Sequence, residues 1–374
     1  QLLREFGQRL CVAAPAPAVV ARLRGDEFAI LLPNSGASEA IELAKRIEIM
    51  LVQPFAIADI ALDVSATIGL ALFPEHGETP HDLFRHVDSA LNLAKKRGSS
   101  YYLFDPVQSK DQSRRLNAAG ELRRAIEGGD LLLYLQPKVN MRTGAVQGVE
   151  GLVRWKHAER GLIPPVEFIG LAEHTGLIRP LTEWVIETAL RLNQAWAGQG
   201  CALPIAVNLS ARNLRDEKLV EKIRNLKTIW GTAAGLLELE ITESTVMDDA
   251  EYALNVLRCL REEGIPLAID DFGTGYSSLT YLQRLPVEYI KIDQSFVRDM
   301  TANKASLAIV RSTIDLVHDL GRKTVAEGVE TQAHWDQLAA LGCDIAQGYW
   351  IARPMPSERF PDWLAQYRAR GSVG

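Results

Sequence analysis

Apolar and polar positions follow a regular pattern over the last two thirds of the chain, where short apolar runs are separated by longer segments of helical periodicity. The runs predict eight strands, near residues 131–139, 146–154, 204–209, 236–242, 267–271, 288–293, 323–327 and 344–350. Eight strands over about 245 residues, most of them followed by a helix, are typical of a (β/α)8 TIM-type barrel of the α/β class. Only residues 140–144 separate the first two strands, too few for a crossover helix, so we expect a hairpin that makes one barrel strand antiparallel.

The first third of the chain has a mixed pattern that predicts a small α+β domain. We expect helices over 2–10, from Ser38 to Val52 with Ser38 as the cap, and from Pro80 to Arg97, and strands over 19–22, 28–32, 64–73 and 101–104. The first two strands are joined at Arg24–Glu27, where a Gly-Asp turn favours a hairpin. A charged helical segment comes next. The predicted domains are therefore 1–107 and 130–374, with a connecting helix over 108–129.

Composition limits the class of protein. With 374 residues, 47% of them hydrophobic and 24% charged, the chain has the composition of a globular protein with room for two domains, which excludes disordered and fibrous classes. The net charge of −6 argues against a non-specific nucleic-acid binder. Four scattered cysteines without a CxxC pair favour a reducing, cytoplasmic setting over a disulfide framework or a zinc site.

The termini and the apolar runs carry no targeting signal. No run approaches the roughly 18 apolar residues of a membrane span, and no charged leader opens the chain. We therefore expect a soluble piece without a membrane segment. Because it begins within a helical pattern, we also expect it to be truncated at its start.

Two adjacent carboxylates follow one of the predicted barrel strands. The apolar run 266–269 leads directly into Asp270 and Asp271, and a loop with two glycines comes next. Neighbouring carboxylates repel, so held together they either raise one pKa or bind a cation, and all-oxygen ligands suit Mg²⁺, Mn²⁺ or Ca²⁺ better than zinc. An isolated pair of this kind could equally be a solvated acidic turn.

The same pattern recurs at other strands, which favours a site over a turn. Polar residues stand at the ends of otherwise apolar runs, namely Glu150, Asn208, Glu240, Lys291, Glu327 and Gln347. In a barrel of parallel strands these ends meet at the rim where active sites lie, and five carboxylates gathered there need cations to compensate them. The alternatives are a solvated rim and, for Lys291, a structural ion pair with a strand-end carboxylate.

Three ordered motifs in the first third resemble the second half of a GGDEF domain, the diguanylate cyclase fold. They are residues 22–30 (RLRGDEFAI), 67–71 (TIGLA) and 94–98 (AKKRG). Arg24 stands where the family signature begins with Gly, and residues 15–18 replace the Arg-x-x-Asp of the family's product-binding site. The resemblance implies a partial, degenerate cyclase-like domain that is inactive as a cyclase. Whether it regulates, or binds GTP without converting it, stays open.

The second resemblance covers about 112 to 365 and is to the EAL domain. Its motifs are residues 150–155 (EGLVRW) and 270–279 (DDFGTGYSSL). The resemblance implies a phosphodiesterase that linearises cyclic di-GMP to 5′-pGpG with two Mg²⁺ or Mn²⁺ ions. Ca²⁺ should inhibit, because its looser geometry would fill the site without holding the in-line arrangement. The alternatives are a catalytically silent cyclic di-GMP receptor and another metal-dependent barrel enzyme.

The EAL resemblance also assigns roles by motif. One metal would be held by Glu150, Asn208, Glu240 and Asp270, and the second by Asp270 and Asp271. Lys291 would orient or activate the water, Glu327 would support Lys291, Glu243 would hold the loop after Asp271, and the substrate would lie along Gln136, Arg154 and Gln347. Gly151 replaces the signature Ala, which we expect to cost ~0.5–1 kcal/mol locally and to remove no ligand. The loop 272–278 leads to a helix that we expect to face a second barrel in a homodimer.

Overall fold

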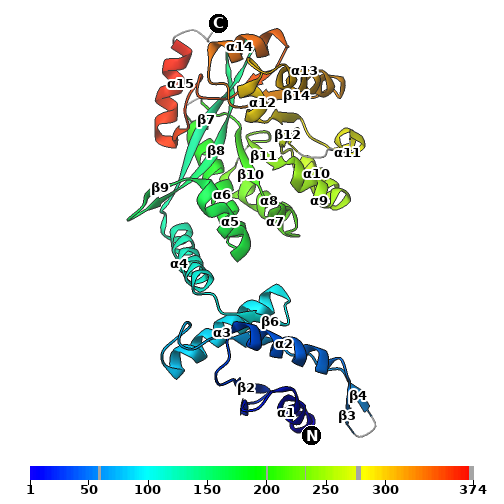
Figure 1. The fold of residues 1–374 in the computed structure, drawn as a ribbon. Coiled ribbons are helices and arrows are strands. Elements are labelled where there is room, and N and C mark those ends of the chain that lie inside the picture. The colour runs from blue at the N-terminus through cyan, green and yellow to red at the C-terminus, as the bar shows by residue number, and fades with distance from the viewer. Residues whose placement is uncertain (58–59, 199–200, 232, 275–278, 370–374) are drawn as a thin grey trace. The chain divides into compact units, whose positions relative to one another are not determined.

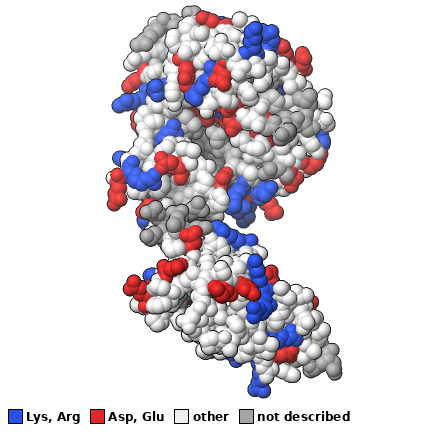
Figure 2. All heavy atoms as spheres, viewed as in Figure 1, with Lys and Arg blue, Asp and Glu red and all other residues white. Residues whose placement is uncertain are grey.

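The chain folds as two units, Gln1–Asn117 and Ala118–Gly374 (Figure 1). The structure is a computed structural model that describes residues 1–57, 60–198, 201–231, 233–274 and 279–369. The division falls within α4 (Pro106–Gly128), which covers most of the predicted connecting helix. No helix among the described residues is long and apolar enough to cross a membrane. Figure 2 shows Lys and Arg interspersed with Asp and Glu over the visible face of each unit, so neither presents a surface of one charge on that side.

In its described residues, the first unit has three short two-stranded pairings and three helices ahead of α4. Its elements are α1 (Leu2–Ala13), β1 (Val19–Arg24), β2 (Glu27–Leu31), α2 (Ala37–Leu51), β3 (Phe55–Ile57), β4 (Ile60–Leu62), β5 (Ile68–Leu70), α3 (Pro80–Arg97) and β6 (Tyr101–Leu103). Strands β1 and β2 form the predicted hairpin, β3 pairs antiparallel with β4, and β5 pairs parallel with β6. Leu10, Leu43 and Ile47 form the centre of its core.

Two predictions for this unit are wrong. The strand over 64–73 is reduced to β5, because only Ile68–Leu70 finds a partner in the short strand β6. The cap of α2 is Gly36 instead of Ser38, because the Glu39 carboxylate accepts the backbone N–H of Gly36 at 3.0 Å and the helix therefore starts at Ala37.

The second unit is a closed eight-stranded barrel. In sheet order its strands are β7 (Leu131–Asn140), β15 (Ile345–Ala346), β14 (Lys323–Ala326), β13 (Tyr289–Ile292), β12 (Leu267–Phe272), β11 (Leu237–Thr242), β10 (Ile205–Leu209) and β8 (Val146–His157), and β8 pairs again with β7. Strand β7 runs antiparallel to both neighbours, so the predicted barrel with one antiparallel strand is confirmed.

The last strand is shorter than the predicted 344–350. After Ala346 the chain passes close to the backbone of Val329, where a side chain at Gly348 would meet the Val329 carbonyl oxygen at 2.1 Å. The N–H of Trp350 then donates to the Val329 carbonyl at 2.9 Å instead of extending the ladder. Glycine is required at this approach because no larger residue fits.

Helices surround the barrel and supply the outer half of its core (Figure 1). They are α5 (Pro165–Thr175), α6 (Ile178–Ala197), α7 (Ala211–Leu214), α8 (Leu219–Trp230), α9 (Glu243–Asp248), α10 (Ala250–Glu262), α11 (Leu279–Arg284), α12 (Gln294–Asp299), α13 (Lys304–Asp319), α14 (Gln332–Ala340), η1 (Ser357–Arg359) and α15 (Phe360–Ala369). Two further short strands, β9 (Gly161–Ile163) and β16 (Met355–Pro356), pair with β8 and β7. The apolar layer between strands and helices leaves the barrel rim as the place for polar groups.

Candidate metal and active site

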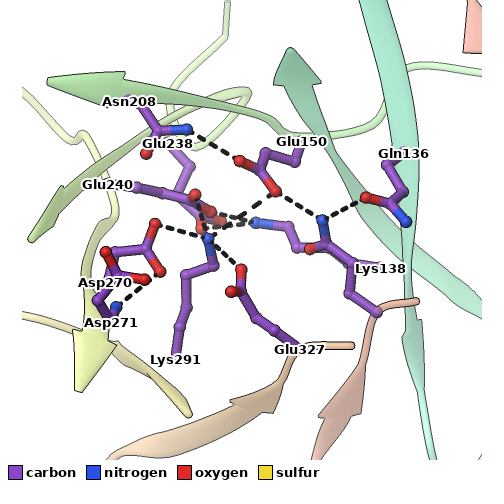
Figure 3. Close-up of polar contacts among 11 residues, drawn as sticks. Gln136, Lys138, Glu150, Asn208, Glu238, Glu240, Asp270, Asp271, Lys291 and Glu327 are labelled. Carbon is purple, nitrogen blue, oxygen red and sulfur yellow. Dashed lines mark hydrogen bonds and ion pairs between the residues drawn. The ribbon is translucent and has the colours of Figure 1, made fainter. Parts of the chain in front are cut away.

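The ends of neighbouring barrel strands bring the predicted polar residues together at one rim. Glu150 comes from β8, Asn208 from β10, Glu240 from β11, Asp270 and Asp271 from β12, Lys291 from β13, Glu327 from the residue after β14, and Gln347 from the residue after β15. Parallel register aligns them, since Asn208 pairs with Glu240 and Asp270 with Thr242 on the neighbouring strands. Figure 3 shows Glu150, Glu240, Asp270 and Glu327 converging on Lys291.

Lys291 is the centre of this cluster and is fully buried. Its Nζ lies 2.6 Å from Glu240, 2.7 Å from Glu327, 3.0 Å from Asp270 and 3.8 Å from Glu150. Burial would lower the pKa of Lys291, but the surrounding carboxylates, Asp270 foremost, raise it well above its ordinary value. The side chain is therefore a permanent cation and hydrogen-bond donor at neutral pH.

Amide side chains orient the Glu150 carboxylate from the other side. Asn208 Nδ2 donates to Glu150 Oε1 at 2.8 Å, and Gln347 Nε2 donates to Glu150 Oε2 at 2.5 Å. Gln347 also donates to Gln136 Oε1 at 3.1 Å, and Gln136 donates to the Ala352 carbonyl at 3.2 Å. Both oxygens of Glu150 thus have fixed donors. The amide oxygen of Asn208 is the atom of that side chain able to act as a cation ligand.

The carboxylates carry more negative charge than Lys291 compensates. Burial raises the pKa of Glu150 and raises the pKa of Glu327 to about 8, although Lys291 acts in the opposite direction on both. Burial, and next the Asp270 charge, raises the pKa of Asp271 to about 6. Such shifts are the expected effect of burial, which disfavours the charged form of a carboxylate, with neighbouring like charges adding to it.

The donor set fits a hard divalent cation. Oxygens of Asp270, Asp271 and Glu327 lie within 4.8 Å of one another, so the acidic cluster can hold such an ion. The ligand atoms are all oxygens, which suit Mg²⁺ or Mn²⁺ better than zinc. Glu150 and Glu240, two of the predicted ligands, are not among these three residues, but they contact Lys291 as Asp270 and Glu327 do.

The turn after Asp271 is held by Glu243. Asp271 has φ of 53° and Gly273 φ of 98°, so the chain turns sharply straight after the paired carboxylates. The N–H of Gly273 donates to Oε2 of the buried Glu243 at 2.9 Å, and the hydroxyl of Thr274 donates to the Asp271 carbonyl at 2.8 Å. The rest of the predicted loop, Gly275–Ser278, lies outside the described residues.

Arg154 lies beside the cluster, on the hairpin of β7 and β8. Its guanidinium donates to the Val153 carbonyl at 2.9 Å and stands 5.5 Å from the centre of the Tyr134 ring. Burial lowers the pKa of Arg154, with Tyr134, Tyr349 and Glu150 acting in the opposite direction. A half-buried guanidinium of this kind is suited to recognising a phosphate.

Two buried charged residues at the site were missed by the sequence analysis, Lys138 on β7 and Glu238 on β11. Lys138 Nζ lies 2.7 Å from Glu238 Oε1 and 3.2 Å from Glu240 Oε1. Alternation along the strands is the signal that could have found them, because Lys138 is two residues from Gln136, and Glu238 two residues from Glu240.

Comparison with known proteins gives two family matches. The model of the EAL domain matches residues 119–354, and that of the diguanylate cyclase, GGDEF domain, matches residues 1–101. MucR of Pseudomonas aeruginosa, named a bifunctional diguanylate cyclase/cyclic di-GMP phosphodiesterase, is 41% identical over 96% of this chain and 53% of its own length. PdeR of Escherichia coli, named a cyclic di-GMP phosphodiesterase, is 37% identical over 99% of this chain and 56% of its own. The chain spans about half the length of these curated relatives.

Solved structures resemble the barrel unit. One, titled as the PaMucR phosphodiesterase in complex with c-di-GMP, is 44% identical with a TM-score of 0.64, covering 66% of this chain and 99% of that one. Another, the FimX EAL domain from Pseudomonas aeruginosa bound to c-di-GMP, is 25% identical with a TM-score of 0.59, covering 63% of this chain and 94% of that one.

Proposed function

Because the chain belongs to the EAL domain family and carries a segment matching the GGDEF domain, we propose that its barrel hydrolyses cyclic di-GMP to 5′-pGpG. The observation that carries the proposal is the buried cluster of strand-end carboxylates around Lys291. The names of the relatives MucR and PdeR support the same substrate and reaction. A lyase of another barrel family would have no use for the cyclase-like segment.

Two Mg²⁺ or Mn²⁺ ions would be held by this rim, one by Glu150, Asn208, Glu240 and Asp270, the other by Asp270 and Asp271. When bound, such ions neutralise charge on a phosphodiester and acidify water. The donor chemistry favours these ions, since carboxylate and amide oxygens predominate among the ligands.

The residues of the chain itself supply orientation and charge. Lys291 keeps its proton at neutral pH, so it donates hydrogen bonds and is unsuited to remove a proton from water. Glu327, 2.7 Å from Lys291 Nζ, fixes the direction of that ammonium group. In this mechanism Lys291 positions the attacking water for in-line displacement, and Glu327 holds Lys291 in place.

Substrate contacts would come from the side of the rim formed by β7, β8 and the segment after β15. Gln136 and Gln347 are joined by a hydrogen bond of 3.1 Å and present amides beside Glu150. Arg154 adds a positive charge for a phosphate of the dinucleotide. Amide groups can pair with the edge of a base, and the guanidinium can bind a phosphate.

The test is turnover by the purified chain. With Mg²⁺ or Mn²⁺ we expect the chain to convert cyclic di-GMP to 5′-pGpG. Chromatography that separates substrate from product measures the conversion. Removal of metal with EDTA should stop the reaction, and excess Ca²⁺ should inhibit it. Binding of cyclic di-GMP without product in either metal would favour the alternative, a silent receptor. If the chain neither binds nor hydrolyses cyclic di-GMP, both the phosphodiesterase and the receptor hypotheses are wrong.

The first unit is proposed to lack cyclase activity. Its signature hairpin between β1 and β2 carries Arg24 at the first position, and Arg24 forms an exposed ion pair with Glu27 at 2.8 Å. Incubation of the Glu150→Ala chain with GTP and Mg²⁺ should give no cyclic di-GMP, since that background would not destroy a product. GTP binding without conversion, measured by calorimetry, would leave a regulatory role open to the unit.

A homodimer formed through the barrel is also proposed. The loop from Phe272 to Ser278 would link Asp271 to the partner, and its first part is held by Glu243. Turnover per chain should then fall on dilution into the monomer range, monitored by light scattering. A monomer as active as the dimer would overturn coupling through this loop.

A further inference from the structure

The buried ion pair of Lys138 and Glu238 lies inside the barrel beside the proposed metal ligands (Figure 3). Both residues are 4% exposed. Burying a lysine and a glutamate is costly even when they pair, and well-packed apolar residues of similar size are often at least as stable. A contribution to stability is therefore a weak explanation for this pair.

Lys138 contacts a second carboxylate besides its partner. Its Nζ lies 2.7 Å from Glu238 Oε1 and 3.2 Å from Glu240 Oε1. Lys291 Nζ donates to the other oxygen of the same carboxylate, Glu240 Oε2, at 2.6 Å. Glu240 is completely buried and lies between two ammonium groups, each bound to a different oxygen.

The backbone explains how Lys138 reaches this position. In the hairpin of β7 and β8, Lys138 pairs directly with Gly148. A side-chain carbon at Gly148 would stand 3.6 Å from Lys138 Cε and 3.1 Å from the Pro204 carbonyl oxygen. The first distance is an ordinary van der Waals contact, so the strand register, which places Lys138 two residues from Gln136 on the same face of β7, is what directs Lys138 into the barrel interior.

The two ammonium groups also act on the pKa of Glu240. Burial would raise the pKa of Glu240, but Lys291 and Lys138 together hold it below its usual range. Glu238 balances the charge of Lys138, so the pair orients Glu240 without changing the net charge that a cation meets at the rim.

We propose that Lys138, held by Glu238, is a positioning residue that fixes the Glu240 carboxylate by binding Oε1, so that Oε2, which contacts Lys291, is the oxygen that would remain for a cation. The inference rests on the proposed function only in taking Glu240 as a metal ligand. The supporting pair consists of Lys138 from the antiparallel strand β7 and Glu238 from β11, and Lys138 is given no contact with substrate.

The test separates positioning from folding. Lys138→Met removes the donor but leaves Glu238 buried without its partner, so this variant should lose stability as well as metal affinity. The double variant Lys138→Met/Glu238→Leu replaces the whole pair by apolar groups and should recover the wild-type melting temperature. If Lys138 positions Glu240, the recovered protein should still bind Mn²⁺ at least about 10-fold more weakly in a calorimetric titration without substrate.

Lys222→Met is the matched control. Lys222 on α8 also contacts two carboxylates, Glu183 on α6 and Asp216 between α7 and α8, so this cluster belongs to the outer layer of the barrel. It should leave the Mn²⁺ affinity unchanged. If the double variant binds Mn²⁺ as the wild type does, the positioning role is wrong. The titration needs no turnover, so a wild-type chain that binds Mn²⁺ but leaves cyclic di-GMP intact would contradict the proposed function and not this inference.

Discussion

Lys291 cannot neutralise the carboxylates that surround it. Its single positive charge faces Glu150, Glu240, Asp270 and Glu327, and the pKa of Glu327 still rises to about 8. A lysine balances one charge, so the others must bind protons or cations to remain together. Charge and burial therefore favour the uptake of protons or cations at this rim, independently of any relative.

Removing one metal ligand should abolish turnover without unfolding the barrel. We expect Glu150→Ala and Asp270→Ala to lower cyclic di-GMP hydrolysis by at least about 100-fold, because even residues that only orient ligands contribute 10–100-fold. Both side chains belong to the rim and not to the apolar core, so circular dichroism and the melting temperature should stay close to wild type. Glu358→Ala, an exposed change on η1, is the control, and near-normal turnover in Glu150→Ala would make the ligand assignment wrong.

Gly151 lies where a side chain would be crowded. The sequence alone predicts that glycine lowers stability at this position, but the contacts around it predict the opposite. A methyl group at this position would lie 3.2 Å from the Ala206 carbonyl oxygen and 3.3 Å from Leu133 Cδ1. Gly151→Ala should therefore lower the unfolding free energy by about 1 kcal/mol while leaving turnover intact. Gly170→Ala on the exposed side of α5 meets open space and should raise it by about 0.5–1 kcal/mol. Equal stabilisation by both changes in thermal unfolding would contradict this account of packing at Gly151.

Among the helices and strands, the sequence predicts features that depend on the local pattern of apolar residues. It misses features that depend on a partner strand far away in the sequence. Asp270 follows four apolar residues, so its position at a strand end could be predicted from the chain alone. The strand over 64–73 could not be bounded, because its length depends on how much of β6 lies beside it. Lys138 resembles a surface residue in sequence and becomes buried only when β7 closes the barrel against β8 and β15.

The turn after β12 depends on one contact from α9. Because Glu243 Oε2 accepts the Gly273 N–H at 2.9 Å, Glu243→Ala should release the turn that carries Asp271. We expect turnover to fall about tenfold or more, with the melting temperature little changed, since the strained backbone at Asp271 loses its support. Glu243→Gln retains an acceptor oxygen and should recover part of the activity. Activity in Glu243→Ala equal to that of Glu358→Ala would contradict the role of this contact.

The loop between β5 and α3 gives the first unit a sensitivity to acid. The N–H of Leu72 donates to Nδ1 of the buried His76 at 3.1 Å, which requires the neutral ring. Burial lowers the pKa of His76 in the fold, and His86 adds to this, while Glu75 and Asp105 oppose it. The unfolded chain thus binds the proton more tightly. The contribution of neutral His76 to the stability of the fold is therefore complete above the unfolded pKa of about 6.5, and it is lost as the pH falls below that value.

His76→Asn tests this assignment, because its amide oxygen replaces the acceptor but does not titrate. Thermal unfolding of the first unit between pH 7.5 and 5.5 should shift downward in the wild type and less in His76→Asn. His81→Asn, at an exposed histidine of α3, should behave as wild type. The same downward shift in His76→Asn would assign the acid sensitivity to another group.

At the scale of the whole molecule, each unit has its own core. Leu10, Leu43 and Ile47 form the centre of the first, and the barrel strands with their outer helices form the second. The acidic rim belongs wholly to the barrel unit, and all seven tryptophans of the chain lie within residues 118–374. Tryptophan fluorescence therefore reports unfolding of the barrel alone, whereas far-ultraviolet circular dichroism reports both units.

This difference allows the metal site to be located in the intact chain. Mg²⁺ that binds the folded rim but not the unfolded chain stabilises the unit that holds it, by about 2.7 kcal/mol at 100 times the dissociation constant. We expect Mg²⁺ to raise the fluorescence-detected melting temperature and to leave a second, metal-insensitive transition in circular dichroism that responds to acid through His76. The Asp270→Ala chain should lose the Mg²⁺ effect, because a ligand and part of the charge that attracts the ion are gone. A Mg²⁺ shift of equal size in both transitions would mean that the two units unfold as one, and an undiminished shift in Asp270→Ala would place the ion outside the rim.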